Sequence, residues 1–503
     1  MKNVLEKGRV TAGQDVLVQL TNQLKMLGTP PLGAEFAQIS GTDLNDALVI
    51  HRITNKFERP HEEKRDEKRL TSIQKMLDYD SSYLENRKDY FKQKGVVSHF
   101  LAARAWLHKH LKGFKPSYQL EFPSGESVVS NRGYVDLYYK LTTESQWTVS
   151  QSCVKQASRI AYNNRALKRV VIERFKKLNL GASDPRKRWV LEAKAANKFV
   201  GFYVFSRIFL YTVTIVGVSR LTTVRKNNDE DRVISCDPTW NLVVQRSIAL
   251  GLLASIKEST GVDIQQLQDV HRRRISDRSQ ATIDLSKASD SNWLNQFTLL
   301  FPKRVVDEVL RARTGLVEYD GEYHVLNQLA PMGCGFTFEI MSITLMAYAR
   351  VLDNDATVFG DDIIINQKSA PRLCKTITNL GWVINEKKSF FEGNFSESCG
   401  GFYNHSTKQD IVSHDLFFPE TMADIIAACN KLSRILRANQ IGKALRNFLL
   451  HAYTSLLKII PSVVYTWDEI RDGEEAEVVW VPKSIPIEVF RPRNQAEYHC
   501  DYQ

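Results

Sequence analysis

Two adjacent carboxylates follow a glycine in the segment Val358-Phe359-Gly360-Asp361-Asp362-Ile363-Ile364-Ile365. The apolar residues on both sides are β-formers, so the segment predicts two short strands joined by a tight hairpin turn. Gly360 gives the turn backbone freedom and places Asp361 and Asp362 at its tip. Two carboxylates on a rigid tip repel each other unless a cation lies between them, which favours a hard divalent ion with oxygen ligands. A solvated, Asp-rich turn is the alternative.

A third carboxylate, Asp284, ends a short β-like run, Ala-Thr-Ile-Asp-Leu, 77 residues before Asp361. If the two strands are neighbours, Asp284 and Asp361 converge on two divalent ions ~3.5–4 Å apart, an arrangement that activates an attacking oxygen and neutralises a leaving one. Successive strand side chains point to opposite faces, so we expect Asp362 to support the ligands or to replace one of them.

A glycine loop lies between these acidic residues, with Gly333 and Gly335 just before an apolar helix expected from about residue 336 to 351. Glycines let a backbone approach a ligand closely. The alternative is an ordinary helix start with Thr337 and Glu339 in its first turn.

Cationic side chains occur on both sides of this region. Arg225, Lys226 and Arg232 share one charged loop, and such residues neutralise a nucleotide's triphosphate opposite the metals. Lys388 follows the acidic turn and is a candidate proton donor to a departing pyrophosphate. Each of these residues, taken alone, also fits a solvated surface.

The composition agrees with a globular protein that meets a polyanion. The chain has 503 residues, more than one ordinary domain, with 43% hydrophobic residues and a formal net charge of +11. Nine basic residues crowd positions 165–188, as a solvated helix face or a track for a phosphate backbone. Seven scattered cysteines and the absence of an apolar leader predict reduced thiols and a cytoplasmic location.

Three further segments carry expectations about secondary structure. Residues 199–218 are almost wholly apolar, but Arg207 lies in their middle, so we expect a buried helix leading into a strand rather than a membrane span. A helix is expected to begin near Ser289-Asp290. Residues 430–464 show amphipathic helical spacing.

Several blocks together resemble the replicases of the leviviruses, the RNA bacteriophages. Residues 283–291 are similar to motif A, 332–339 to motif B, 359–364 to motif C and 385–390 to motif D, with a further match at 395–401. Residues 224–228, with Arg232 and Asp237-Pro238, resemble the loop of the fingers where nucleotides enter. The blocks keep the family's order and spacing from about residue 222 to 403, with a weaker likeness at 123–133. Phe359 stands where the family often has Tyr, and Cys334 where Asn is frequent.

The resemblance implies an α+β fold, the right-hand polymerase of palm, fingers and thumb, with an antiparallel palm sheet flanked by helices. It implies residues 1–218 as the N-terminal region and fingers, 219–280 as fingers with the nucleotide loop, 281–405 as the catalytic palm, and 406–503 as the thumb and C-terminal region.

The implied activity is RNA-directed RNA polymerisation that replicates a single-stranded RNA phage genome with two Mg²⁺ or Mn²⁺ ions. Asp284 and Asp361 would hold the metals with Asp362, and Lys388 would be the proton donor. The nucleotide would meet the residues Arg225, Lys226, Arg232, Ser289, Asp290, Gly333 and Thr337. Asp290 would sense the ribose, although its spacing from Asp284 leaves Ser289 open for that role.

The resemblance also implies partners and a location. They are RNA template and product, ribonucleoside triphosphates, host translation elongation factors and a ribosomal protein, in the cytoplasm of a bacterial host and without a membrane. Two other functions stay open: a reverse transcriptase-like palm polymerase, and a non-catalytic basic RNA-binding protein, to which the basic clusters alone fit equally well.

Overall fold

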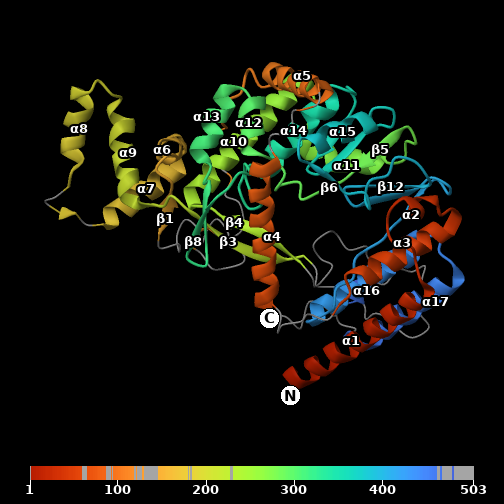
Figure 1. Cartoon of the computed structure of the whole chain (residues 1–503). Coiled ribbons are helices and arrows are strands. Elements are labelled where there is room, and N and C mark those ends of the chain that lie inside the picture. Colours follow the sequence, from red (N-terminus) through yellow and green to blue (C-terminus); the bar gives the residue numbers. More distant parts are fainter. Residues whose placement is uncertain are drawn as a thin grey trace. The chain divides into compact units, whose positions relative to one another are not determined.

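The structure is a computed structural model that describes residues 2–58, 65–86, 92, 94–117, 121, 127–129, 146–178, 180–181, 184–226, 230–461, 465–466 and 479–480. Helices and strands are mixed along the chain, which agrees with the predicted α+β class (Figure 1). The chain forms two compact units. Unit 1 contains Met1–Glu63, Asp269–Asp284 and Asn385–Gln503, and unit 2 contains Lys64–Gln268 and Leu285–Ile384.

Long helices form the larger core of unit 1. They are α1 (Lys2–Leu27), α3 (Gly41–Asn55), α16 (Met422–Ala438) and α17 (Lys443–Ile459), with the short α2 (Ala34–Gln38) before α3. Helix α1 packs against α3, α16 and α17, and the shared core includes Leu24, Leu432 and Tyr453, all fully buried. The small parallel pair β15 (Tyr465–Thr466) and β16 (Val479–Trp480) contacts α16.

The predicted helical character of residues 430–464 is confirmed over 430–438 and 443–459, but in two helices, because the chain turns between α16 and α17. Asn439 leaves the helix with φ −101° and ψ 142°. Its amide side chain then bonds to the backbone of Val412, accepting from the N–H at 2.9 Å and donating to the carbonyl at 2.5 Å. The Gly442 N–H donates to the carboxylate of Asp46 at 2.9 Å. Contacts distant in sequence therefore end a helix that its own periodicity would continue.

A small antiparallel sheet positions Asp284 in unit 1. Its strands are β12 (Phe395–Ser398), β13 (Gly401–Asn404) and β14 (Gln409–Asp410), in that order. The strand β5 (Gln280–Ile283) contacts β12, and Thr282 forms an antiparallel bridge with Phe390. Phe36 of α2 packs on Phe395, with ring centroids 5.2 Å apart. Asp284 follows directly on β5, as predicted.

Two buried helices run through unit 2. They are α10 (Thr239–Thr260) and α14 (Thr337–Arg350), and α14 matches the predicted apolar helix. Helix α14 contacts α5 (Lys94–His110), α15 (Ala370–Asn379), β9 (Thr357–Phe359) and β10 (Asp362–Asn366). Next to α10 and α5 lie α13 (Lys303–Ala312) and α12 (Leu294–Leu300). These contacts give the β9–β10 hairpin a rigid support.

A four-stranded sheet of unit 2 carries the charged loop. The strand order is β4 (Asp231–Cys236), β3 (Ser219–Arg225), β7 (Leu316–Tyr319) and β8 (Glu322–Val325), and helix α4 (Arg65–Asn86) contacts β3 and β4. A two-stranded pair joins β6 (Leu285–Ser286) to β11 (Val383–Ile384). The short helices η4 (Ile264–Gln266) and α11 (Leu267–Arg274) follow α10 along the chain.

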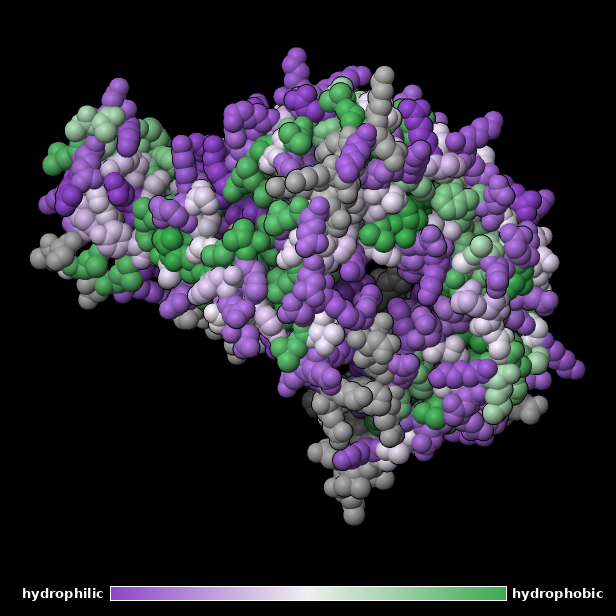
Figure 2. Space-filling model, viewed as in Figure 1, coloured by the Kyte–Doolittle hydropathy of each residue, from purple (hydrophilic) through white to green (hydrophobic). Residues whose placement is uncertain are grey.

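Four helices form what we call the α6–α9 module, at the left of Figure 1: α6 (Val154–Asn163), α7 (Arg165–Lys177), α8 (Arg186–Ala195) and α9 (Val200–Thr212). The strand β2 (Val213–Ile215) follows α9 directly and pairs with β1 (Trp147–Val149), which confirms the predicted helix leading into a strand. The expected burial is wrong for part of the segment, since Phe199, Tyr211 and Ile215 are 72%, 50% and 44% exposed. Figure 2 shows hydrophilic and apolar residues side by side on the visible face of the module. Among the described residues, no helix has the length and apolar character needed to cross a membrane.

Candidate functional site

The predicted hairpin is present, with Gly360 and Asp361 as its two-residue loop between β9 and β10. Gly360 has φ +65°, and a positive φ at the first loop residue suits a type II′ turn, which favours glycine there. A Cβ atom at Gly360 would lie 2.9 Å from the ring of Phe338. The Gly360 N–H donates to Ser342 Oγ of α14, 2.9 Å away. Phe338 and Ser342 of α14 therefore both hold the turn at Gly360.

The two adjacent carboxylates differ in their surroundings. Asp361 is exposed in the loop, whereas Asp362 is half-buried, begins β10 and pairs with Phe359 across the hairpin. The ring of Phe359, where the levivirus family often has Tyr, packs edge-on against Phe338, with centroids 4.8 Å apart. The hairpin thus presents Asp361 to solvent and holds Asp362 closer to the protein.

In unit 1, the segment after residue 384 surrounds Asp284. The Asp284 N–H donates to Ser389 Oγ at 3.1 Å, and the Asp284 carbonyl accepts from the Asn385 N–H at 2.9 Å. The carboxylate lies 3.4 Å from the Asn385 amide nitrogen and 3.5 Å from Lys388 Nζ. Its side chain is only 15% exposed. The structure therefore brings together Asp284 and Lys388, two of the predicted residues.

Glu397 of β12 is a further carboxyl group in the surroundings of Lys388 and Asp284, and the sequence did not single it out. Burial raises the pKa of Glu397, while the charges of Lys388 and Arg52 lower it and that of Asp284 raises it further. Its Oε2 atom is buried and has no hydrogen-bond partner among the described residues. The only signal in the sequence was its place in the block of residues 395–401.

In unit 2, the turn after β6 carries Ser289 and Asp290. Lys287 has φ +53°, a left-handed conformation that L-residues rarely adopt, and the Ser291 N–H donates to its carbonyl at 2.9 Å. This turn corrects the expected helix start at Ser289-Asp290, since α12 begins only at Leu294. The local reversal moves both side chains off a helix and into a compact loop.

The carboxyl group of Asp290 is mostly buried in this turn. Burial raises its pKa to about 6, against the lowering effects of the Ser289 hydroxyl, which donates to Asp290 Oδ1 at 3.2 Å, and of the Lys287 and Lys226 charges. The charge of Asp80 raises the pKa. The charge of Lys226 is thus one of those that lower the pKa of Asp290.

The three candidate cations are all exposed, but the segment expected to be one charged loop is a β-hairpin, in which Arg225 ends β3 and Arg232 lies in β4. Arg225 stands opposite Asp231 in the β3–β4 ladder and Arg232 stands opposite Val224. Lys226 Nζ lies 3.1 Å from Glu230 Oε2, and both side chains are 47% exposed. Asn227 and Asn228, which belong to the matched block, lie outside the described residues, as do residues 123–126 and 132–133.

The glycine loop packs on β4. Gly333 has φ +100°, and a Cβ atom there would lie 2.3 Å from the carbonyl oxygen of Ser235. Thr337 is buried, and its hydroxyl donates to the Pro331 carbonyl at 2.9 Å. Both predicted residues therefore hold the loop in place: Gly333 by close approach to a neighbouring backbone, and Thr337 by closing the loop on itself.

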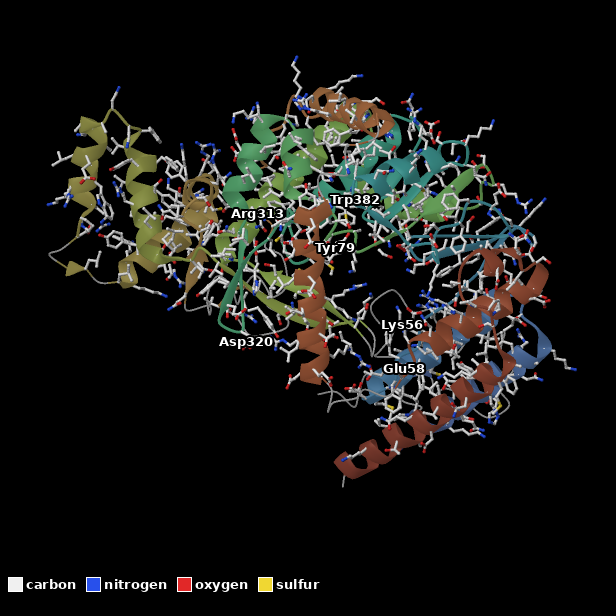
Figure 3. All side chains as sticks on the ribbon, viewed as in Figure 1. Lys56, Glu58, Tyr79, Arg313, Asp320 and Trp382 are labelled. Atoms are coloured by element: carbon white, nitrogen blue, oxygen red, sulfur yellow. The ribbon has the colours of Figure 1, made fainter. Side chains whose placement is uncertain are left out.

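Helix α4 supplies two residues that contact the turn after β6 and the segment before the glycine loop, and no local pattern in the sequence indicated them. Tyr79, labelled in Figure 3, shares a hydrogen bond with Ser291 Oγ at 2.9 Å. The neighbouring Asp80 is buried and accepts from the backbone N–H groups of Asn327 and Gln328, the latter at 2.7 Å. Helix α4 thereby ties together turns far apart in sequence.

The predicted metal ligands Asp284 and Asp361 belong to different units, so their pairing stays a prediction. In the part of the chain that the structure describes, no group of three or more His, Cys, Asp or Glu side chains is arranged to hold a metal ion. The three predicted ligands, Asp284, Asp361 and Asp362, therefore do not form such a group there, and the metal site stays a prediction that rests on their oxygen donors, the type that Mg²⁺ and Mn²⁺ prefer.

Comparison with known proteins identifies relatives among RNA phages. The chain is 35% identical over 231 residues to the RNA-directed RNA polymerase subunit beta of Escherichia virus Qbeta, covering 43% of this chain and 38% of that protein. It is 32% identical over 223 residues to the RNA-directed RNA polymerase beta chain of Enterobacteria phage GA, covering 42% and 41%. The matched region thus spans about two fifths of the relatives' length.

A solved structure, the RNA-dependent RNA polymerase of a human picorbirnavirus, aligns at 13% identity over 49% of this chain and 58% of that chain. Its TM-score of 0.35 is too low to bear on the fold. The family model described as RNA replicase, beta-chain, matches residues 53–473. That match covers most of the chain and confirms the resemblance to the levivirus replicases: the protein belongs to the RNA replicase beta-chain family.

Proposed function

We propose that this protein is an RNA-directed RNA polymerase that copies a single-stranded RNA phage genome. The observation that carries the proposal is the exposed Asp361 on a turn pinned by Gly360, in a chain of the replicase beta-chain family. An acidic residue on a rigid, solvent-facing turn is suited to binding a cation where substrates arrive. The palm, fingers and thumb, and the four-part division at residues 218, 280 and 405, are part of this proposal.

Asp284 and Asp361 are proposed to hold two Mg²⁺ or Mn²⁺ ions, with Asp362 in support. When bound, such ions neutralise charge on the reacting phosphate and lower the pKa of the attacking hydroxyl. The Asp284 carboxylate supports this role as an oxygen donor that is 15% exposed and lies 3.5 Å from the cationic Lys388 Nζ. Asn385, Ser389 and the short β11–β6 pair orient the backbone beside it.

The remaining residues are proposed to bind the nucleotide. Arg225, Lys226 and Arg232 are exposed cations suited to a triphosphate, and Lys226 already acts electrostatically on Asp290. Asp290 or Ser289 would meet the ribose, and Gly333 and Thr337 would shape the loop next to the base. Lys388, beside Asp284, would donate a proton to the departing pyrophosphate.

The decisive experiment supplies the purified chain with an RNA template, four ribonucleotides and Mg²⁺, with and without bacterial extract. The extract tests the proposed need for host elongation factors and a ribosomal protein in a bacterial cytoplasm. Deoxynucleotides in a parallel reaction separate the polymerase from a reverse transcriptase-like enzyme.

The matched variant for this experiment is Asp361→Asn, which keeps the size of the side chain and removes its charge. We expect it to lose elongation and to keep RNA binding, because the metal ligand is removed and the phosphate contacts are not. Extension at the wild-type rate by Asp361→Asn would refute the metal assignment. A wild-type chain that binds RNA and incorporates no nucleotide in extract would favour the non-catalytic RNA-binding alternative.

A further inference from the structure

The net positive charge of the protein is concentrated in the α6–α9 module. Residues 154–212 contain 14 Lys and Arg but only 3 Asp and Glu, a formal net charge of +11. The whole chain has 68 basic and 57 acidic residues, so the remainder of the chain carries 54 of each. The basic character of the protein is therefore a property of one helical module, and the rest is neutral overall.

The basic side chains form exposed stripes opposite the buried faces of the helices. On α7, Arg165, Arg169 and Lys176 are exposed and follow helical spacing along one side, while the buried residues of that helix are Leu167, Val171 and Phe175. Lys155 and Arg159 are exposed one turn apart on α6, and Lys187 and Lys194 two turns apart on α8. The apolar faces fold the module, and the charged faces are left to solvent.

Among the described residues, the stripes have no acidic partners. Two of the three acidic side chains of the module pair with other arginines, Asp184 with Arg186 and Glu192 with Arg188. Within the described part of the chain, no ion pair is formed by the seven stripe residues Lys155, Arg159, Arg165, Arg169, Lys176, Lys187 and Lys194. Like charges at helical spacing repel each other. A bound polyanion would neutralise this repulsion, which no ion pair among the described residues relieves.

Exposed apolar side chains lie among these charges. Phe199 is 72% exposed, Leu191 66% and Tyr211 50%. The Tyr211 ring packs against Trp189, with centroids 5.3 Å apart, and Phe199 packs edge-on against Tyr162. Cations that track a backbone, next to aromatic faces on which bases stack, are the features with which proteins bind single strands. This combination favours a single-stranded nucleic acid over a partner that offers negative charge alone.

We propose that the exposed stripes of α6, α7 and α8 bind single-stranded RNA, through residues other than those assigned to the nucleotide and to catalysis. Within unit 2, helix α8 lies well apart from α14, which supports the Gly360-Asp361 turn (Figure 1), and none of the seven stripe residues is among those assigned to the nucleotide or to catalysis. The choice of RNA as the polyanion rests on the proposed function. The module then holds template or product strand outside the polymerisation site and raises its local concentration.

The test uses the full chain and a fluorescein-labelled oligouridylate, with binding followed by anisotropy across a range of salt concentrations. The variant Arg165→Gln/Arg169→Gln/Lys176→Gln removes the α7 stripe. Each phosphate contact on a single strand contributes about 0.7 to the slope of log K against log salt, so we expect a slope shallower by about 2 and weaker binding at low salt.

The control is Lys109→Gln/Lys112→Gln/Lys375→Gln, which removes the same charge from exposed positions outside the module. We expect it to keep the wild-type slope. An equal loss in both variants would overturn the proposal, because net charge alone would then explain binding. Unchanged RNA binding by the α7 variant would also overturn it and would assign the module to another partner, such as an acidic protein.

The outcome is separable from that of the proposed function. At saturating template, the α7 variant is expected to extend RNA at the wild-type rate, whereas Asp361→Asn is expected to bind RNA normally and not to extend it. One outcome would be that the wild type binds RNA but never extends it, while the α7 variant shows the shallower salt dependence of RNA binding. In that case the polymerase proposal fails and the proposed RNA site is supported.

Discussion

The ammonium group of Lys287 lies 4.3 Å from the centroid of the Tyr79 ring. The lysine belongs to the turn after β6 and holds a left-handed conformation, and the tyrosine belongs to α4. The hydroxyl of Tyr79 reaches Ser291 on the far side of the same turn. Two contacts from one side chain thus hold the loop that carries Ser289 and Asp290.

Tyr79→Phe keeps the ring over Lys287 and removes the hydroxyl's hydrogen bonds to Ser291 and to the Gly381 carbonyl. We expect the free energy of unfolding to fall by about 1–2 kcal/mol, the usual net value of two such bonds, with little change in the rate of nucleotide addition. Tyr79→Ala, which also removes the ring, is expected to slow nucleotide addition markedly. Chemical denaturation and single-turnover extension check both. The control Tyr323→Phe alters a side chain of a residue that is 64% exposed and is expected to change neither quantity.

Gly360→Ala tests the turn that presents Asp361. The left-handed conformation costs an alanine about 1–2 kcal/mol, and the added Cβ also meets the Phe338 ring, which is itself packed against Phe359. Gly321→Ala is the matched control, because Gly321 has φ +81° in the β7–β8 turn but nothing within 4 Å of an added Cβ. We expect Gly360→Ala to be the less stable variant and the one that loses elongation. Equal unfolding free energies for the two variants would show that the close approach is unimportant.

The buried carboxyl of Asp290 predicts a pH dependence of stability. Its pKa rises from 3.8 to about 6 on folding because burial disfavours the charged form. Between these values the folded state binds more protons than the unfolded state, so stability falls as the pH rises from about 4 to about 6. Asp290→Asn removes this contribution. We expect the unfolding free energy of the wild type to decrease relative to that of the variant between about pH 4 and about pH 6. Parallel plots of unfolding free energy against pH for the two proteins would contradict the raised pKa of Asp290.

Arg232→Ala tests the charged loop. Arg232 is exposed on β4 opposite Val224, and its loss removes a cation that we assign to the triphosphate. We expect the nucleotide concentration for half-maximal rate to rise several-fold while the rate at saturation changes little, as for a binding contact present before and during reaction. The control is Arg304→Ala, which removes an exposed arginine of α13. We expect this variant to keep the wild-type nucleotide dependence. An unchanged value for Arg232→Ala would remove that residue from the site.

Local patterns predicted several elements correctly. The β-forming runs around Gly360 and the apolar run of α14 each depend on neighbours in sequence, and both are present as expected. The apolar stretch over 199–218 forms α9 followed by β2. Its arginine and its β-branched residues had already distinguished it from a membrane helix. Where local propensity and burial agree, sequence alone suffices.

Other features depended on contacts between distant segments. The pairing of Asn439 with Val412 ended α16, and the turn at Lys287 replaced a predicted helix start. Glu397, Tyr79 and Asp80 had no local signature, because their partners lie far away in the chain. A side chain whose role comes from a long-range contact looks ordinary in its own segment.

The sequence by itself determined the chemistry that this protein offers: acidic residues at strand ends, a glycine turn, a charged loop and a basic segment. These depend on residue type and spacing, which are read directly along the chain. Only the tertiary structure decided which of these groups are buried, paired or exposed. Lys388 joined Asp284, Thr337 turned inward, and the stripes of α6–α8 stayed in solvent, because burial and hydrogen bonding are set by segments that meet only on folding.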